Sequence, residues 1–249
     1  MKLLEVCVDS LTSARNAIAG GADRLELCSA LVAGGLTPYV HLLEQIRAES
    51  NIPIRCLMRP RPGDFLYESH EIDLMAKQIP VLKAAGADGF VIGCLDTQGM
   101  VDQKAMRPLV EAADGSGLTL HRCIDVSVGF ADSMLSAAEL GIDTILTSGG
   151  AAHCLQGLES LEAILEIKDA FALDLNILVG AGVNADVIRT IRQKLPGIHA
   201  FHMSGKVNVP SGMIFRREGI PMGLPGLDEW HIPTTSQDAV RLARAALDT

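Results

Sequence analysis

Short apolar runs alternate with helical patterns along the whole chain. Each run is three to six residues long and is followed by apolar residues at helical spacing. Strands that alternate with helices form parallel sheets, and eight such units close into a (β/α)8 barrel of the TIM type. The expected strands cover residues 3–8, 24–27, 53–58, 89–93, 118–120, 144–146, 176–179 and 200–203, and the expected helices with their caps cover 10–19, 37–49, 72–85, 103–113, 131–140, 158–170, 185–195 and 237–247.

Length and composition agree with a single domain over residues 1–249. The chain has 249 residues, and one such barrel has roughly 250. Its residues are 48% hydrophobic but only 4% aromatic, which suits parallel strands that are buried on both faces. The net charge of −9 comes without a basic stripe, so we expect no nucleic-acid partner. No uncharged apolar stretch approaches about 18 residues, so we also expect no membrane span.

The first residues are typical of a strand rather than of a signal peptide. Glu5 and Asp9 interrupt the apolar stretch, whereas a signal peptide needs a longer uncharged one. This favours the cytoplasm, where thiols normally stay reduced. The six cysteines are therefore expected to be free.

A long segment at about 204–231 separates the last expected strand from the last helix. It is rich in Gly and Pro and contains Trp230, the single tryptophan of the chain. Loops longer than about 12–15 residues within a compact domain are usually functional. We expect an irregular segment. It is either a binding loop or a structural excursion that covers the bottom of the barrel or contacts a second copy of the chain.

Polar residues occupy the faces that should point into the barrel. Side chains alternate along a strand, so Glu26 and Cys28 share one face, as do Arg55 and Arg59 on the next strand. A purely structural barrel interior would carry branched aliphatic residues there. Buried charges are costly unless they are paired. The pattern therefore predicts either a pocket for an anionic ligand or an internal ion-pair network.

The ends of the strands supply candidate catalytic and anion-binding groups. In TIM barrels, reactive residues gather at these ends, and loops after the seventh and eighth strands often hold phosphate with backbone N–H groups. Proton transfer would need a carboxylate or an imidazole. The candidates for catalysis are Glu26, His121 and Asp125, and those for anion binding are Arg59, Arg61, Arg122, Ser148, Gly182, Ser204 and Gly205.

Two cysteines are candidate metal ligands. The chain has no C-x-x-C pair, which excludes the usual zinc and redox motifs. Cys7 and Cys28 end neighbouring strands on the predicted inward face, and neighbouring strands lie about 4.8 Å apart. Two soft thiolates at that spacing suit Cu(I). The alternative is that both cysteines are small buried hydrophobic residues.

Several motifs together resemble the CutC family of copper homeostasis proteins. They are EVCVDS at 5–10, GADRLELC at 21–28, GGLTP at 34–38, RPRPGDFLY at 59–67, LHRCID at 120–125, TSGG at 147–150 and GAGV at 180–183. The resemblance implies a TIM-type barrel, a cytoplasmic role in copper homeostasis, and Cu(I) binding at Cys7 and Cys28. The family commonly has RPRGGDF where this chain has Pro62, a residue that lacks a backbone N–H.

Three functions remain open on the sequence. The first is copper homeostasis through bound copper(I). The second is an enzyme that acts on a small phosphorylated or carboxylated substrate in a pocket of Arg, Glu and His residues, with no direct copper role. The third is a protein whose charged interior is purely structural. The expected partners are accordingly a metal ion or a small oxyanionic ligand, together with a second copy of the chain in a homodimer.

Overall fold

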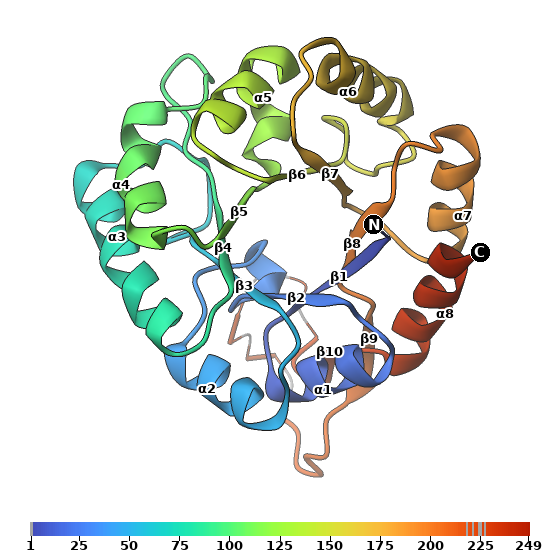
Figure 1. Cartoon of the computed structure of the whole chain (residues 1–249). Helices are drawn as coiled ribbons and strands as arrows, with labels where there is room; N and C mark the ends of the chain where they lie inside the picture. Colours follow the sequence, from blue (N-terminus) through green and yellow to red (C-terminus); the bar gives the residue numbers. More distant parts are fainter. Residues whose placement is uncertain (1, 218, 221, 224–225, 227) are drawn as a thin grey trace.

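Eight parallel strands form a closed barrel in the order β1 to β8, and helices surround it (Figure 1). The structure is a computed structural model and describes residues 2–217, 219–220, 222–223, 226 and 228–249. The strands are β1 (Leu3–Val8), β2 (Arg24–Leu27), β3 (Ile54–Leu57), β4 (Gly89–Ile92), β5 (Gly117–Leu120), β6 (Thr144–Thr147), β7 (Asn176–Val179) and β8 (Ala200–Met203). The helices are α1 (Leu11–Ala19), α2 (Val40–Glu49), α3 (Ser69–Ala84), α4 (Gln103–Ala113), α5 (Phe130–Glu139), α6 (Leu158–Ala170), α7 (Ala185–Lys194) and α8 (Gln237–Asp248), with short 3-10 turns η1 (Leu31–Ala33) and η2 (Arg122–Val126).

The predicted fold class is confirmed, but two helix starts were wrong. The third helix was expected to begin at residue 72, but α3 begins at Ser69, after a capping box formed by Glu68 and Glu71. Thr37 and Pro38 were expected to open the second helix, but α2 begins at Val40. The Thr37 hydroxyl instead accepts the backbone N–H of Arg59, and the Thr37 N–H donates to the Arg59 carbonyl. These bonds hold Thr37 against the end of β3. It is therefore not available to cap a helix.

The strand register places charged side chains in the barrel interior. Glu5 pairs with Arg24, Cys7 with Glu26, and Glu26 with Arg55. The residues between them, such as Val6 and Leu25, are fully buried against the helices, as the alternation of side chains requires. The interior also holds two small apolar clusters, one of Cys28, Leu57 and Val91 and one of Leu146, Leu178 and Ala200.

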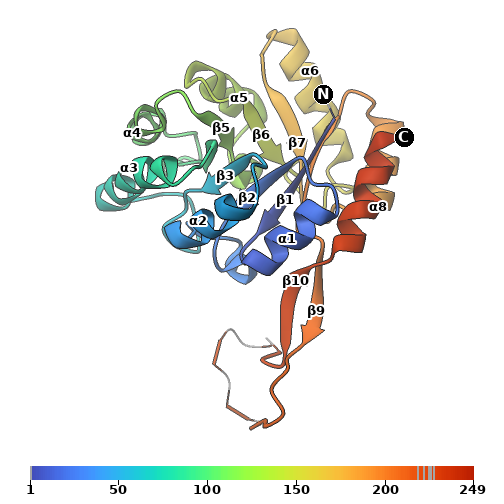
Figure 2. The same ribbon diagram turned by 60° about the horizontal axis from the view of Figure 1, so that its bottom comes forward.

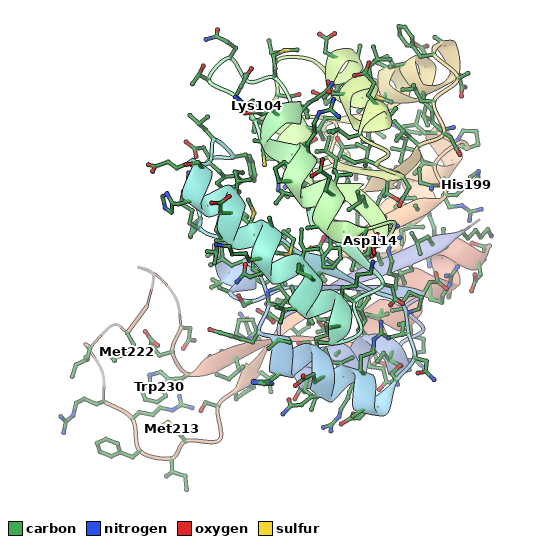
Figure 3. All side chains as sticks on the ribbon, turned by 60° about the vertical axis from the view of Figure 1, so that its left-hand side comes forward. Lys104, Asp114, His199, Met213, Met222 and Trp230 are labelled. Atoms are coloured by element: carbon green, nitrogen blue, oxygen red, sulfur yellow. The ribbon has the colours of Figure 1, made fainter. Side chains whose placement is uncertain are left out.

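The segment at 204–231 contains more regular structure than predicted. Its first residues form β9 (Lys206–Pro210), which pairs with β10 (His231–Thr235) as an antiparallel ribbon. This ribbon and the described residues between its two strands form an arm that projects from the barrel (Figure 2). Met213, Met222 and Trp230 lie on the arm, away from the helices (Figure 3). Sequence reasoning missed the ribbon because its partner strand follows the predicted segment.

No helix in the described ranges is long and apolar enough to cross a membrane. The arm exposes apolar side chains, including Ile214 at 99% and Phe215 at 68%. The expected homodimer stays a prediction.

Candidate functional site

A cavity of about 260 Å³ opens at the carboxyl ends of the barrel strands. We call it the mouth cavity. Residues of β1, β2, β3, β6 and β8 line it, together with residues of the loops after β2, β3 and β5. Its polar lining residues are Cys7, Glu26, Arg59, His121, Arg122 and His202. Four of these were predicted from the ends of the first, second, third and fifth strands, and Arg122 was predicted as an anion ligand.

A buried ion-pair cluster lies beside the mouth cavity. Glu5 accepts a hydrogen bond from Arg24 Nε at 2.5 Å and pairs with His202 Nδ1 at 2.8 Å. Burial alone would raise the pKa of Glu5, but the charge of Arg24 and the contacts with His202 outweigh it and lower the pKa to about 2. Glu5 therefore carries a negative charge at neutral pH.

Glu26 lies in the same interior with fewer partners. Its carboxyl group is buried, and its Oε2 atom has no hydrogen-bond partner in the described part of the chain. Burial raises the pKa of Glu26 to about 7, and the charge of His202 opposes that rise. A carboxyl group with this pKa can accept and return protons near neutral pH.

His202 links the ion-pair cluster to the cavity. Its Nδ1 atom is paired with Glu5, so Nε2 is the ring nitrogen left for the cavity. Burial would lower the pKa of His202, but Cys7, Glu26 and Glu5 raise it well above its usual value. The ligand atoms of Glu5, Glu26 and His202 lie within 4.8 Å of one another. This is the one group of three or more that could hold a metal ion among the described residues.

His121 faces the cavity as a neutral ring. Its Nδ1 atom accepts the backbone N–H of Cys123 at 3.2 Å. Burial and the charge of Arg59 lower the pKa of His121 to about 3. A neutral ring that accepts at Nδ1 carries its proton on Nε2, and this Nε2 is buried without a partner among the residues described. Phe65 packs against the ring, with the centroids 4.7 Å apart.

Arg59 is held by backbone carbonyl groups rather than by a carboxylate. Its Nη1 atom donates to Ala33 and Gly35, and its Nη2 atom donates to Gly63. The guanidinium lies over the ring of Phe65, 5.4 Å from the centroid. Its Nε atom is buried and unpartnered within the described ranges. We call Glu26, Arg59 and His121 the mouth triad.

Asp125 belongs to a different polar cluster. Its carboxylate accepts hydrogen bonds from Thr147, from the backbone and hydroxyl of Ser148, from Gly150 N–H and from Arg122 Nε. We call these five residues the Asp125 cluster. Asp125 and Ser148 do not line the mouth cavity, because their polar atoms bind each other.

A second cavity of about 490 Å³ lies next to the mouth cavity, and Cys7, Arg122 and His202 line both. We call it the side cavity. Its lining includes Gly182 and Ser204 from the loops after β7 and β8, as a phosphate-binding position in this fold requires. Gly182 has a φ of +77°, which favours glycine. Lys206 also lines this cavity and donates to Asp9 at 3.1 Å.

Three predicted anion ligands line neither cavity: Ser148 of the Asp125 cluster, Arg61 and Gly205. Arg61 donates to Asp64 at 3.0 Å and to Glu71 at 2.8 Å. These bonds hold its side chain against its own loop and the first turn of α3. Gly205 has a φ of +55° and sits where Ser236 donates to its carbonyl, so it shapes the turn into β9.

The two candidate metal ligands have different surroundings. Cys7 lines both cavities. Cys28 is fully buried in the cluster with Leu57 and Val91, and its thiol donates to the Val8 carbonyl at 3.5 Å. Burial and the nearby Cys7 raise the pKa of the Cys28 thiol. All six cysteines are buried and free.

Sequence reasoning missed His202. It lies on β8 between Phe201 and Met203, which are buried in the core. The same alternation that selected Glu26 would have placed it on the inward face. A histidine at an inward position, opposite Glu5 in the register, was the signal that could have found it.

The model of the CutC family matches residues 2–207. This chain belongs to the CutC family. The CutC family proteins of Vibrio cholerae and Aliivibrio fischeri are each 39% identical to it, over 246 and 243 residues. The alignments cover 98% and 96% of this chain and 95% and 97% of those relatives.

Solved structures agree with the fold of this CutC family chain. A Streptococcus agalactiae protein, described as a candidate copper homeostasis protein CutC, matches with a TM-score of 0.75 and 27% identity, over 82% of this chain and 99% of that one. The phosphoribosylanthranilate isomerase of Pyrococcus furiosus matches with a TM-score of 0.57 and 12% identity, over 100% and 99% of the two chains. The second likeness shows the barrel fold alone.

Proposed function

We propose that this chain takes part in copper homeostasis by binding Cu(I) at the barrel mouth through Cys7 Sγ and His202 Nε2. The role is the one named for the Streptococcus agalactiae relative. Cu(I) prefers soft sulfur ligands and also accepts imidazole. The observation that carries the proposal is that Cys7 and His202 line the same two cavities.

The surroundings of His202 suit a metal ligand. Histidines that bind metals usually give their second ring nitrogen to a carboxylate, which fixes the orientation of the ring. Glu5 takes that place on Nδ1 at 2.8 Å. Because the pKa of His202 is raised, its ring has to lose a proton before it can bind a metal. Copper binding should therefore release protons and strengthen as pH rises.

Cys28, predicted as the second sulfur ligand, needs a larger change before it can bind. Its thiol would have to leave the Val8 carbonyl and lose its proton in an apolar cluster that raises its pKa. His202 needs only to lose its proton. Substitutions of Cys28 and His202 therefore distinguish a Cys7–Cys28 site from a Cys7–His202 site.

The test is an anaerobic titration of the reduced protein with Cu(I) against a competing chelator. We expect Cys7→Ser and His202→Gln each to weaken binding by at least about tenfold. Cys28→Ser should bind like the wild type, and Cys154→Ser, another buried free cysteine, is the matched control. If only the two cysteine changes at positions 7 and 28 weaken binding, the ligands are the predicted pair. Weak binding that no change affects would refute the copper role.

A second candidate function is an enzyme that acts on a small anionic substrate. It is favoured by the two adjoining cavities, one with unpartnered buried polar atoms and one lined by Arg122, Ser204 and Lys206. Inorganic phosphate should bind at the side cavity. Titration monitored by NMR would detect this binding, and Lys206→Ala should weaken it while the exposed control Lys104→Ala does not.

We also expect this chain to act in the cytoplasm. The six buried free cysteines support this, since thiols normally stay reduced there. Fractionation of cells that produce the chain would test the expectation.

A further inference from the structure

The mouth triad has more unpartnered polar atoms than a metal site at Cys7 and His202 would use. Glu26 Oε2, Arg59 Nε and His121 Nε2 are all buried without a hydrogen-bond partner in the part of the chain described. All three residues line the mouth cavity. A buried polar atom without a partner costs about 1–3 kcal/mol. Three such atoms around one cavity therefore indicate a ligand that pairs with them.

The chemistry of the triad limits what this ligand is. His121 Nε2 and Arg59 Nε are N–H donors, and neither can accept a hydrogen bond. They share contact with Phe65, which lies against both side chains. Both side chains therefore line the mouth cavity beside Phe65, and a ligand bound on that side of the cavity has both N–H donors to bind. A neutral imidazole beside a fixed cation stabilises a carbonyl oxygen as negative charge develops on it.

Glu26 supplies the opposite chemistry. It projects from β2, whereas His121 follows β5 on another part of the barrel wall. Glu26 lines the cavity, and its carboxyl group can take a proton from a molecule that lies between the two. A cavity of about 260 Å³ has room for a molecule of a few heavy atoms.

The side cavity indicates what else the ligand carries. It meets the mouth cavity along Cys7, Arg122 and His202, and Lys206 and Ser204 line the side cavity only. Cationic and hydroxyl groups beside a glycine loop suit a phosphate group. A ligand that spans both cavities would place its carbonyl group at the mouth triad and its phosphate in the side cavity.

We propose that this chain catalyses proton transfer at the carbon next to the carbonyl group of a small phosphorylated ketone or aldehyde, with Glu26 as the base and His121 and Arg59 as donors to the carbonyl oxygen. The proposal rests on the second candidate function above. It gives that function a reaction type and a substrate class.

The step is balanced without an oxidant or a cofactor. The Glu26 carboxylate takes a proton from the carbon beside the carbonyl group, and the C–H bonding pair forms a carbon–carbon double bond. The π pair of the carbonyl group moves onto its oxygen, which the His121 and Arg59 N–H groups stabilise. Return of a proton from Glu26 to carbon restores the carbonyl compound. In D2O the returned particle is a deuteron.

The test measures this exchange directly. The purified full chain is incubated in D2O with hydroxyacetone phosphate, with hydroxyacetone and with pyruvate, in the presence of a metal chelator. NMR measures deuterium incorporation, and ligand-observed NMR measures binding of the same compounds. We expect exchange to be fastest for hydroxyacetone phosphate. Glu26→Gln should slow it by at least about 100-fold, and His121→Asn should slow it by about 100-fold, while both variants keep binding.

Glu162→Gln is the matched control because Glu162 is an exposed carboxylate on α6. It should exchange at the wild-type rate. Exchange that survives Glu26→Gln in a folded variant would show that Glu26 is not the base and overturn the proposal. Binding of hydroxyacetone phosphate without exchange would leave an anion-binding site but refute this reaction. If none of the three compounds binds, the second candidate function fails together with the proposal, whereas the copper titration is unaffected.

Discussion

The barrel mouth holds two polar clusters that differ in how completely their hydrogen bonds are made. In the Asp125 cluster, both carboxylate oxygens accept hydrogen bonds from side chains and backbone N–H groups. In the mouth triad, each of the three side chains keeps one buried polar atom without a partner among the described residues. Both clusters lie at strand ends, and both contain residues predicted as catalytic.

The difference separates a role in stability from a role in binding. A cluster whose hydrogen bonds are all made stabilises the folded chain, and removing one member lowers that stability. An incompletely bonded cluster costs the folded chain stability that a ligand can restore. Asp125 is therefore best understood as the group that holds η2 against the loop after β6. Glu26 and His121 keep the candidate catalytic role.

The largest effect expected from this comparison is on Asp125. Asp125→Ala should lower the free energy of unfolding by roughly 3–5 kcal/mol, because it leaves Ser148 N–H, Thr147 Oγ1 and their neighbours without an acceptor. Urea denaturation would measure the change. Glu162→Ala, at an exposed helix position, should stay within about 0.5 kcal/mol of the wild type. A loss below about 1 kcal/mol for Asp125→Ala would mean that the cluster does not stabilise the fold.

The next effect concerns the pH dependence of stability at Glu26. Its pKa is raised to about 7 in the folded chain from 4.5, so the folded state holds the proton more tightly than the unfolded state. The resulting stabilisation is fully present below pH 4.5 and is lost as pH rises through about 7. The glutamine in Glu26→Gln cannot ionise, so this variant does not lose stability as pH rises. The variant should therefore gain stability relative to the wild type between pH 5 and 8, by at most about 3 kcal/mol.

Urea denaturation of both proteins at several pH values measures this gain. Glu162→Gln, which changes an exposed carboxylate, is the control and should run parallel to the wild type. A difference between Glu26→Gln and the wild type that stays constant from pH 5 to 8 would contradict the raised pKa.

The smallest effect is expected at Arg61. Its ion pairs with Asp64 and Glu71 lie at the surface, with 36% of the Arg61 side chain exposed. Pairs of this kind contribute about 0–1 kcal/mol. Arg61→Ala should change stability by no more than that and should leave phosphate binding unchanged, as an NMR titration would show. Weaker phosphate binding in Arg61→Ala would show that Arg61 is an anion ligand, as the sequence predicts.

Much of the candidate site could be predicted from the alternation of side chains along short strands. Glu26, Cys7 and His121 were predicted on inward faces, and all three line the mouth cavity. Arg61 lies beyond the end of β3, where alternation no longer applies and the path of the loop decides where a side chain points. Its contacts with Glu71 and Leu66 could not be foreseen from spacing.

The sequence by itself determined the order of the elements, the closed barrel and the residues that face its interior, because apolar periodicity and strand alternation are local properties of a chain. Only the tertiary structure decided which polar atoms find partners. The Asp125 carboxylate is fully hydrogen-bonded by Ser148 and its neighbours, whereas Glu26 and His121 each keep one polar atom without a partner among the residues that the structure describes. Hydrogen bonding depends on distances of a few tenths of an ångström between residues far apart in the chain, and no local pattern fixes those distances.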